Sequence, residues 1–84
     1  MSEKVCMIIG GGRGMGAATA RQMHSRGYQL ALMSPSTSCE TLAAELGGVA
    51  ERGRAESATD LNSIFRTTME KFRRIDSVLI HVGG

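Results

Sequence analysis

Aromatic residues are scarce in this sequence, and their scarcity limits what can fill a core. The 84 residues include no tryptophan, one tyrosine and two phenylalanines. Hydrophobic residues still make up 42%, so a packed domain is expected rather than a disordered tail. Aliphatic and methionine side chains must therefore fill the core. The length supports one small domain and leaves no room for a second.

Cysteine is also sparse, and its placement argues against a metal or disulfide framework. Cys6 and Cys39 form no CxxC pair, and with the two histidines they show no spacing typical of a zinc site. Cys6 lies in an apolar run, which favours a reduced core thiol and hence a cytoplasmic location. No apolar run has the length of a membrane span, and the N-terminus lacks the hydrophobic stretch of a signal peptide. We therefore expect no membrane partner.

A strong charge of one sign is lacking as well. The formal net charge is +2, and the basic residues are scattered without interleaved aromatics. This pattern does not favour a nucleic-acid partner. Basic side chains of this kind are more often solvated than ligand-binding. The residues concerned are Arg52, Arg54, Arg66, Lys71, Arg73 and Arg74.

Short apolar runs alternate with helical patterns along the chain. Residues 5–9 are apolar throughout, as expected of a strand buried on both faces. Further strands are expected at residues 29–33, between residues 49 and 58, and at residues 77–82. Helices are expected at residues 15–26, 37–46 and 61–72.

Periodicity and capping signals support these helices. In the last one, six residues fall on one helical face: Leu61, Ile64, Phe65, Thr68, Met69 and Phe72. Thr37 and Glu40 have the spacing of a capping box at the start of the second helix. Gly27 follows the first helix in the position of a C′ glycine.

The order strand, helix, strand, helix, strand, helix, strand predicts an α/β fold. Right-handed crossovers give a doubly wound parallel sheet of the Rossmann type, with four strands in the order 3-2-1-4 and about three helices. The fourth strand then forms an apolar edge, and such edges invite pairing with another chain. We expect this edge to be covered by a C-terminal half of a longer protein or by a second copy of the chain.

Glycine, with 11 residues, is abundant, and many of these residues lie between the first strand and the first helix. That context suits a loop that binds a dinucleotide. Gly10 allows a sharp turn, the absence of a side chain at Gly14 lets the pyrophosphate approach, and Gly16 allows close packing of helix on strand. Unpaired N–H groups and the helix dipole then face the phosphates. The candidate cofactor-binding residues here are Gly10, Gly12, Arg13, Gly14, Met15 and Gly16.

Two glycine registers fit this loop. One uses Gly10, Gly14 and Gly16, and the other runs Gly12-x-Gly14-x-x-Ala17. The first is preferred because Gly10 directly follows the apolar strand. A P-loop is rejected, because Ala17 stands where a phosphate-binding lysine would be required. The remaining alternative is a turn that only packs helix on strand.

The loop and the end of the chain together resemble the short-chain dehydrogenase/reductase family. The likeness rests on Gly10-x-x-x-Gly14-x-Gly16, on the Phe72-x-x-Ile-Asp76 segment and on residues 78–84. The last segment is similar to the family's strand leading into Asn-Asn-Ala-Gly, beside the cofactor. His81 and Val82 replace the two asparagines and Gly83 replaces the alanine. The resemblance implies that the chain is an NAD(P)-binding half-domain.

The resemblance also implies contacts around the adenine and the nicotinamide end. Aligning Thr59-Asp60 with the family's helix opening puts Ser57 and Ala58 at an Asp-Val pair that contacts the adenine. Ser57 could accept one hydrogen bond from the adenine amine. His81 and Gly83 are expected beside the cofactor. A structural role for His81 is favoured over a catalytic one.

The end of the second strand favours NADP over NAD. NAD sites usually place an acidic residue there, and this chain has Ser34, Pro35 and Ser36 instead. No carboxylate is present at this position to repel a 2′-phosphate. Ser34 and Ser36 could donate hydrogen bonds to that phosphate. In the family, a basic residue at the position of Arg13 often contacts that phosphate. Helix capping is the alternative role for the hydroxyl-rich segment, and a solvated loop residue is the alternative for Arg13.

Catalytic residues are not predicted in this chain. The resemblance implies a serine and a Tyr-x-x-x-Lys pair beyond the fourth strand. The single tyrosine, Tyr28, has Leu32 four positions later. We therefore expect the chain alone to be inactive and to form the cofactor-binding portion of an oxidoreductase. The alternative is a non-catalytic nucleotide-binding or protein-interaction module.

Overall fold

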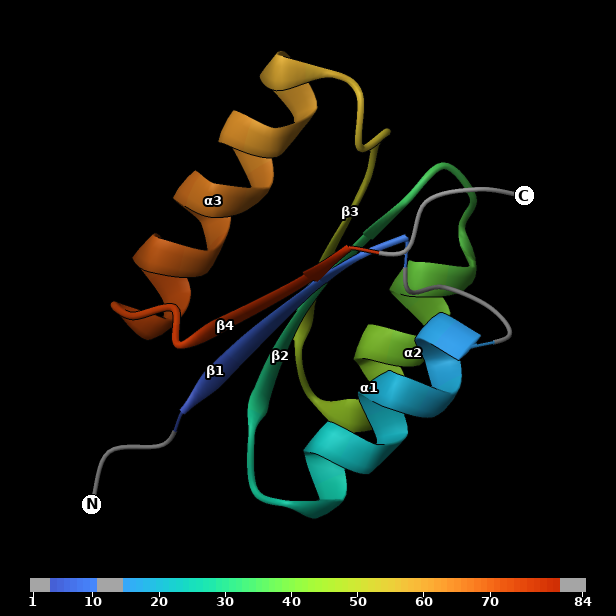
Figure 1. Cartoon of the computed structure of the whole chain (residues 1–84), viewed down its shortest axis with the longest axis vertical. Helices are drawn as coiled ribbons and strands as arrows, with labels where there is room; N and C mark the ends of the chain where they lie inside the picture. Colours follow the sequence, from blue (N-terminus) through green and yellow to red (C-terminus); the bar gives the residue numbers. More distant parts are fainter. Residues whose placement is uncertain (1–3, 11–14, 81–84) are drawn as a thin grey trace.

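A computed structural model describes residues 4–10 and 15–80. Within these residues the chain forms four strands and three helices, in the order predicted (Figure 1). Their bounds are β1 Val5–Ile9, α1 Met15–Ser25, β2 Gln29–Ser34, α2 Ser38–Leu46, β3 Val49–Arg52, α3 Ala58–Phe72 and β4 Ser77–Ile80. The strands form one parallel sheet in the order β3-β2-β1-β4, which confirms the predicted doubly wound topology.

The two faces of the sheet are covered by different helices. Figure 1 shows α1 and α2 on one face and α3 on the other. Alternate side chains of a strand point to opposite faces. Ile8 and Leu32 accordingly pack in the cluster on the α1 and α2 side, whereas Ile9 and Met33 pack with Ile64 of α3. Because both faces are covered, β1 and β2 are apolar runs rather than alternating ones.

The sheet is fastened at its amino-terminal edge by Asp76, the residue before β4. Its carboxylate accepts the Val5 N–H at 2.7 Å, and its own N–H donates to the Val5 carbonyl at 2.9 Å. Arg74 donates two hydrogen bonds to the same carboxylate, at 2.9 and 2.7 Å. The Arg74 guanidinium, and next the Val5 N–H, hold the pKa of Asp76 below its usual value. Asp76 therefore joins the starts of β1 and β4.

The helix starts differ from the predicted capping. The capping box at Thr37 and Glu40 is wrong: Thr37 is the N-cap of α2, but it is helical in backbone and its side chain makes no cap bond. An N-cap side chain reaches the first turn from extended backbone. Ser57 has that geometry, with φ −98° and ψ 114°, and its Oγ accepts the Asp60 N–H at 3.2 Å. The side-chain cap is therefore at the start of α3.

The apolar face predicted for α3 is only partly buried. Ile64 and Thr68 are fully buried, whereas Phe65 and Met69 are 40% and 45% exposed. On β4, Val78 and Ile80 are exposed and stand in register with strand residues that face α3. We call Phe65, Met69, Val78 and Ile80 the β4-side patch. Within the described residues, no strand pairs with the outer edge of β4.

Neither cysteine forms a disulfide, and both are buried. Burial raises the pKa of the Cys6 thiol, which disfavours the reactive thiolate.

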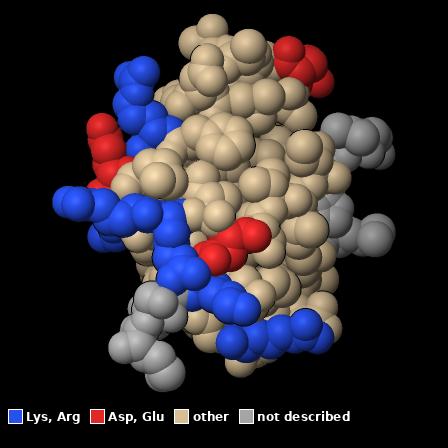
Figure 2. All heavy atoms as spheres, turned by 60° about the vertical axis from the view of Figure 1, so that its left-hand side comes forward, with Lys and Arg blue, Asp and Glu red and all other residues tan. Residues whose placement is uncertain are grey.

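In the described part of the chain, no helix combines the length and apolar character needed to cross a bilayer. The face that α3 forms carries a band of Lys and Arg side chains with acidic ones among them (Figure 2).

Candidate cofactor site at the carboxyl ends of the strands

The carboxyl ends of the parallel strands meet at one edge of the sheet. Gly10 follows β1 there, Pro35 follows β2 and Gly53 follows β3. Two hydrogen bonds join the residues that follow β1 and β3 to β2. The Gly10 N–H donates to the Met33 carbonyl at 2.5 Å, and the Gly53 N–H donates to the Ser34 carbonyl at 2.9 Å. Ligands of doubly wound sheets bind outside this edge.

Gly10 makes the turn that the glycine loop requires. Its φ is +84°, a left-handed conformation that strains residues with a side chain. The first helix then begins at Met15, and Gly16 is buried within it. In sequence, α1 therefore begins five residues after the turn, and the N-terminus of such a helix favours an anion.

The other predicted residues of the loop and of the chain end lie outside the described residues. In the loop these are Gly12, Arg13 and Gly14, and beyond β4 they are His81 and Gly83. Their cofactor contacts stay predictions.

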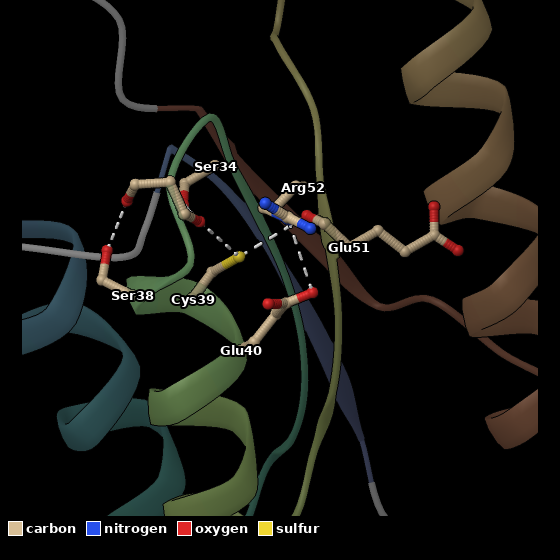
Figure 3. Close-up of polar contacts among 7 residues, drawn as sticks. Ser34, Ser38, Cys39, Glu40, Glu51 and Arg52 are labelled. Carbon is tan, nitrogen blue, oxygen red and sulfur yellow. Dashed lines mark hydrogen bonds and ion pairs between the residues drawn. The ribbon is translucent and has the colours of Figure 1, made fainter.

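The segment after β2 is held by its own hydroxyl groups. Ser34 is buried, and its Oγ donates to the Ser36 carbonyl at 3.1 Å. The Oγ atoms of Ser36 and Ser38 are 2.6 Å apart. Figure 3 shows Ser34, Ser38 and Cys39 at this segment. The Cys39 sulfur lies 3.5 Å from the carbonyl oxygens of both Ser36 and Glu51, so its one hydrogen is shared between these two acceptors. These bonds tie the segment to β3 and leave Ser36 exposed, whereas Ser34 is turned inward.

A first hollow, of about 480 Å³, lies between α1 and α2. Hydroxyl groups of Ser36, Ser38 and Thr41 line it, and Arg21 and Glu45 form part of its wall. Both terminal nitrogens of Arg21 donate to the Glu45 carboxylate, one of them at 3.2 Å. This hydrogen-bonded pair lowers the pKa of Glu45. The arginine charge is therefore already matched, and the hollow offers mainly hydroxyl groups to a ligand.

A second hollow, of about 300 Å³, lies beyond the ends of β2 and β3. Its lining comprises Pro35, Arg52, Gly53, Arg54 and Asp60. The Asp60 carboxylate accepts the backbone N–H of Arg54 at 3.0 Å, which fixes the turn that leaves β3. A Cβ at Gly53 would lie 2.8 Å from the Asp60 Cβ and 2.9 Å from the Met33 sulfur. Glycine there allows the turn to pack against α3 and the sheet.

Ser57 and Ala58 stand at the start of α3, not directly after β3. The strand ends at Arg52, so Gly53 and Arg54 are the first residues beyond it. The Ser57 hydroxyl accepts the Asp60 N–H, which uses one of its two lone pairs. The predicted adenine contacts of Ser57 and Ala58 stay predictions.

The sequence pattern assigned Arg52 and Arg54 to a solvated surface, and both side chains are exposed. What the pattern did not give was the end of β3. Once the strand is placed at Val49–Arg52, the rule for parallel sheets puts both arginines at the ligand-binding edge. In their hollow, unlike the first one, the cationic side chains make no hydrogen bond to their nearest carboxylates, Glu40 at 3.8 Å and Glu56 at 3.7 Å.

Metal binding finds no support in the described ranges: residues 4–10 and 15–80 contain no group of three or more histidine, cysteine, aspartate or glutamate side chains able to hold an ion. A parallel sheet in the order 3-2-1-4, a left-handed glycine at the end of β1 and a helix that begins at Met15 are typical of a dinucleotide-binding α/β protein.

Comparison with known proteins gives the family. A family model described as short chain dehydrogenase matches residues 4–84. The chain therefore belongs to the short-chain dehydrogenase/reductase family, whose members are oxidoreductases that bind NAD or NADP. This confirms the resemblance identified from the glycine loop and from the segment around β4.

Two relatives illustrate the similarity of this chain to reductases and dehydrogenases. The chain is 35% identical over 85 residues to 3-oxoacyl-[acyl-carrier-protein] reductase of Rattus norvegicus, an alignment that covers 98% of this chain and 36% of that protein. It is 33% identical to 1,6-dihydroxycyclohexa-2,4-diene-1-carboxylate dehydrogenase of Pseudomonas putida, covering 96% and 32%.

A solved structure, that of an alcohol dehydrogenase from Thermococcus sibiricus complexed with 5-hydroxy-NADP, is 31% identical with a TM-score of 0.76. It is matched over 92% of this chain and 36% of that one. The chain thus spans about a third of the length of these relatives.

Proposed function

We propose that this chain is the cofactor-binding portion of a short-chain dehydrogenase/reductase and that it prefers NADP. The observation that carries the proposal is the carboxyl edge of the sheet, where Gly10 has a positive φ and residues 34–39 include no carboxylate. The NADP analogue bound in the Thermococcus relative supports the same cofactor class. NADPH bound here would supply the hydride of a carbonyl reduction.

The glycines of the loop bind the pyrophosphate in this proposal. Arg13, Ser34 and Ser36 bind the adenosine ribose and its 2′-phosphate, and Ser57 and Ala58 lie at the adenine. For Ser34 the hydroxyl must exchange its bond to the Ser36 carbonyl for one to the ligand. The serine and Tyr-x-x-x-Lys that the family uses for proton transfer are not in this sequence, so the proposal assigns the chain binding and not turnover.

Calorimetric titration with NADPH and NADH tests this function, with circular dichroism as a control for folding. We expect NADPH to bind more tightly, because the exit of β2 has hydroxyl groups and no carboxylate to repel the 2′-phosphate. Equal affinities would contradict the NADP preference. A folded chain that binds neither nucleotide would contradict the function itself.

The β4-side patch favours an additional role in association. Exposed apolar side chains next to an unpaired strand edge are typical of an interface. The occupant we propose is the C-terminal part of a longer protein, since the relatives are about three times as long as this chain. Sedimentation equilibrium of the chain tests the alternative of a symmetric dimer. A concentration-dependent dimer that Ile80→Lys abolishes would favour self-association.

A further inference from the structure

The second hollow brings two arginines to the residue that ends β2. In the sheet register, Arg52 is the partner of Ser34, and neighbouring strands are about 4.8 Å apart. Arg54 follows two residues later, and both line the same hollow with Pro35. Figure 3 shows Arg52 between β3 and the segment that follows Ser34. A ligand at the exit of β2 therefore lies beside two guanidinium groups.

The charges of these arginines are loosely paired. Arg52 is 3.8 Å from the nearest oxygen of Glu40, and Arg54 is 3.7 Å from that of Glu56. Both distances exceed the length of a hydrogen bond. The side chains of both arginines and both glutamates are about half or more exposed. Pairs of this kind contribute little to stability. By contrast, Arg21 and Arg74 donate two hydrogen bonds each to their carboxylates.

The chemistry of the hollow suits a phosphate group. A guanidinium has a planar fork of N–H donors that matches phosphate oxygens, and it stays charged at all physiological pH values. The N-terminal end of α3 adds its dipole, because Asp60 in its first turn lines the same hollow. The Asp60 carboxylate opposes this, but it already accepts the Arg54 N–H.

We infer that Arg52 and Arg54 select the phosphorylated dinucleotide by binding the 2′-phosphate of its adenosine ribose, an inference that rests on the proposed function. The ribose of a dinucleotide lies at the end of β2 in a doubly wound sheet, which is where Arg52 stands in register. The phosphate replaces Glu40 and Glu56 as the partner of the two guanidinium groups.

Adenosine 2′,5′-bisphosphate and adenosine 5′-monophosphate are the probes, because they differ only in the 2′-phosphate. Each is titrated into the full chain and into Arg52→Gln, Arg54→Gln and the double variant. One charged hydrogen bond is worth roughly 1.5–3 kcal/mol, so each substitution should weaken bisphosphate binding about tenfold or more. Monophosphate binding should stay the same. These are exposed residues, so folding should be unaffected.

Two further variants sharpen the test. Arg66→Gln removes an equal charge from an exposed position on α3 that lines neither hollow, and it should bind both probes as the unaltered chain does. Glu40→Gln removes the carboxylate that competes for Arg52, and it should bind the bisphosphate more tightly. The opposite signs of the two effects at Arg52 and Glu40 distinguish a phosphate contact from a change in folding.

The inference is overturned if the double variant binds the bisphosphate as tightly as the unaltered chain, or if it loses affinity for both probes equally. In either case the unaltered chain can still bind NADPH, so the proposed function survives. An unaltered, folded chain that binds neither NADPH nor NADH removes the proposed function and this inference together.

Discussion

The charged side chains at the amino-terminal and carboxyl edges of the sheet differ in how closely they are paired. At the amino-terminal edge, Asp76 accepts hydrogen bonds from Arg74 and from the backbone of Val5. At the carboxyl edge, Arg52 and Arg54 stand 3.8 and 3.7 Å from their nearest carboxylates and make no hydrogen bond to them. The charges of the first edge are matched within the protein. Those of the second edge are available to a ligand.

This difference separates residues that stabilise the fold from residues that bind. Substitutions at the amino-terminal edge should alter the free energy of unfolding and leave nucleotide preference alone. Substitutions of Arg52 and Arg54 at the carboxyl edge should alter nucleotide affinity and leave the free energy of unfolding nearly unchanged. A residue that does the reverse would break the comparison.

The largest effect is expected for Gly14→Val. If the pyrophosphate approaches the backbone there, the added side chain should weaken NADPH and NADH binding alike, by about a hundredfold for a steric cost near 3 kcal/mol. Calorimetry measures the loss. Ala18→Val adds the same kind of side chain on an exposed position of α1 and serves as the control. Full affinity in folded Gly14→Val would remove the glycine loop from the site.

A carboxylate placed beside the two arginines should reverse nucleotide preference. Pro35 is exposed and lines the second hollow, so Pro35→Asp would pair with the guanidinium groups and repel a 2′-phosphate. We expect the ratio of NADPH to NADH affinity to fall about tenfold, with Pro35→Asn as the uncharged control. The prediction fails if the two substitutions change the ratio equally.

A smaller effect separates the two helix starts at the carboxyl edge. Ser57→Ala removes an N-cap hydrogen bond and should cost about 1 kcal/mol in the free energy of unfolding. Thr37→Ala should cost much less, because the Thr37 side chain makes no such bond. Urea unfolding of both variants measures the difference. Equal losses in the free energy of unfolding would mean that the Ser57 cap hydrogen bond does not stabilise α3.

The smallest and most pH-dependent effect is expected at Asp76, where the side chain is solvent-accessible. The pKa of Asp76 in the folded chain is lowered, chiefly by Arg74, so the unfolded chain binds the proton more readily. Its contribution to stability is therefore present above the unfolded pKa and is lost as the pH falls through the folded pKa. Asp76→Asn should lower the urea midpoint near neutral pH.

Acid conditions provide the control for this prediction. Below the folded pKa of Asp76, the variant and the unaltered chain should unfold at similar urea concentrations, because the native carboxyl is then protonated as well. A midpoint difference that is the same at every pH would show that Asp76 acts only through its shape. Nucleotide preference should be unchanged throughout.

The fold was predictable for the strands whose burial produces a clear apolar pattern in the sequence. β1 and β2 are covered on both faces, and their unbroken apolar runs predicted central strands correctly. The glycine cluster after residues 5–9 indicated the turn at Gly10, which has the expected positive φ. Given these elements, the handedness of the crossovers determines the strand order, and the observed order confirms it.

The outer elements were harder to predict because fewer neighbours constrain them. β3 has only four residues, two of them charged, and its end could not be placed from the pattern. For that reason the pattern did not place Arg52 and Arg54 at the carboxyl edge of the sheet. The apolar face of α3 predicted burial of Phe65 and Met69, yet periodicity cannot tell whether a partner covers the face. The spacing of Thr37 and Glu40 likewise cannot reveal the backbone angles on which a cap depends.

The contrast between the two edges is tested most directly by NMR, by following backbone amide shifts of the chain during titration with NADPH. We expect the large shifts at the carboxyl edge, at Gly10, Ser36, Gly53 and Arg54, and none at Val5 or Asp76. NADH should shift Gly10 but leave Gly53 and Arg54 nearly unchanged. Shifts concentrated around Asp76, or no shifts in a folded chain, would contradict a dinucleotide site at the carboxyl ends of the strands.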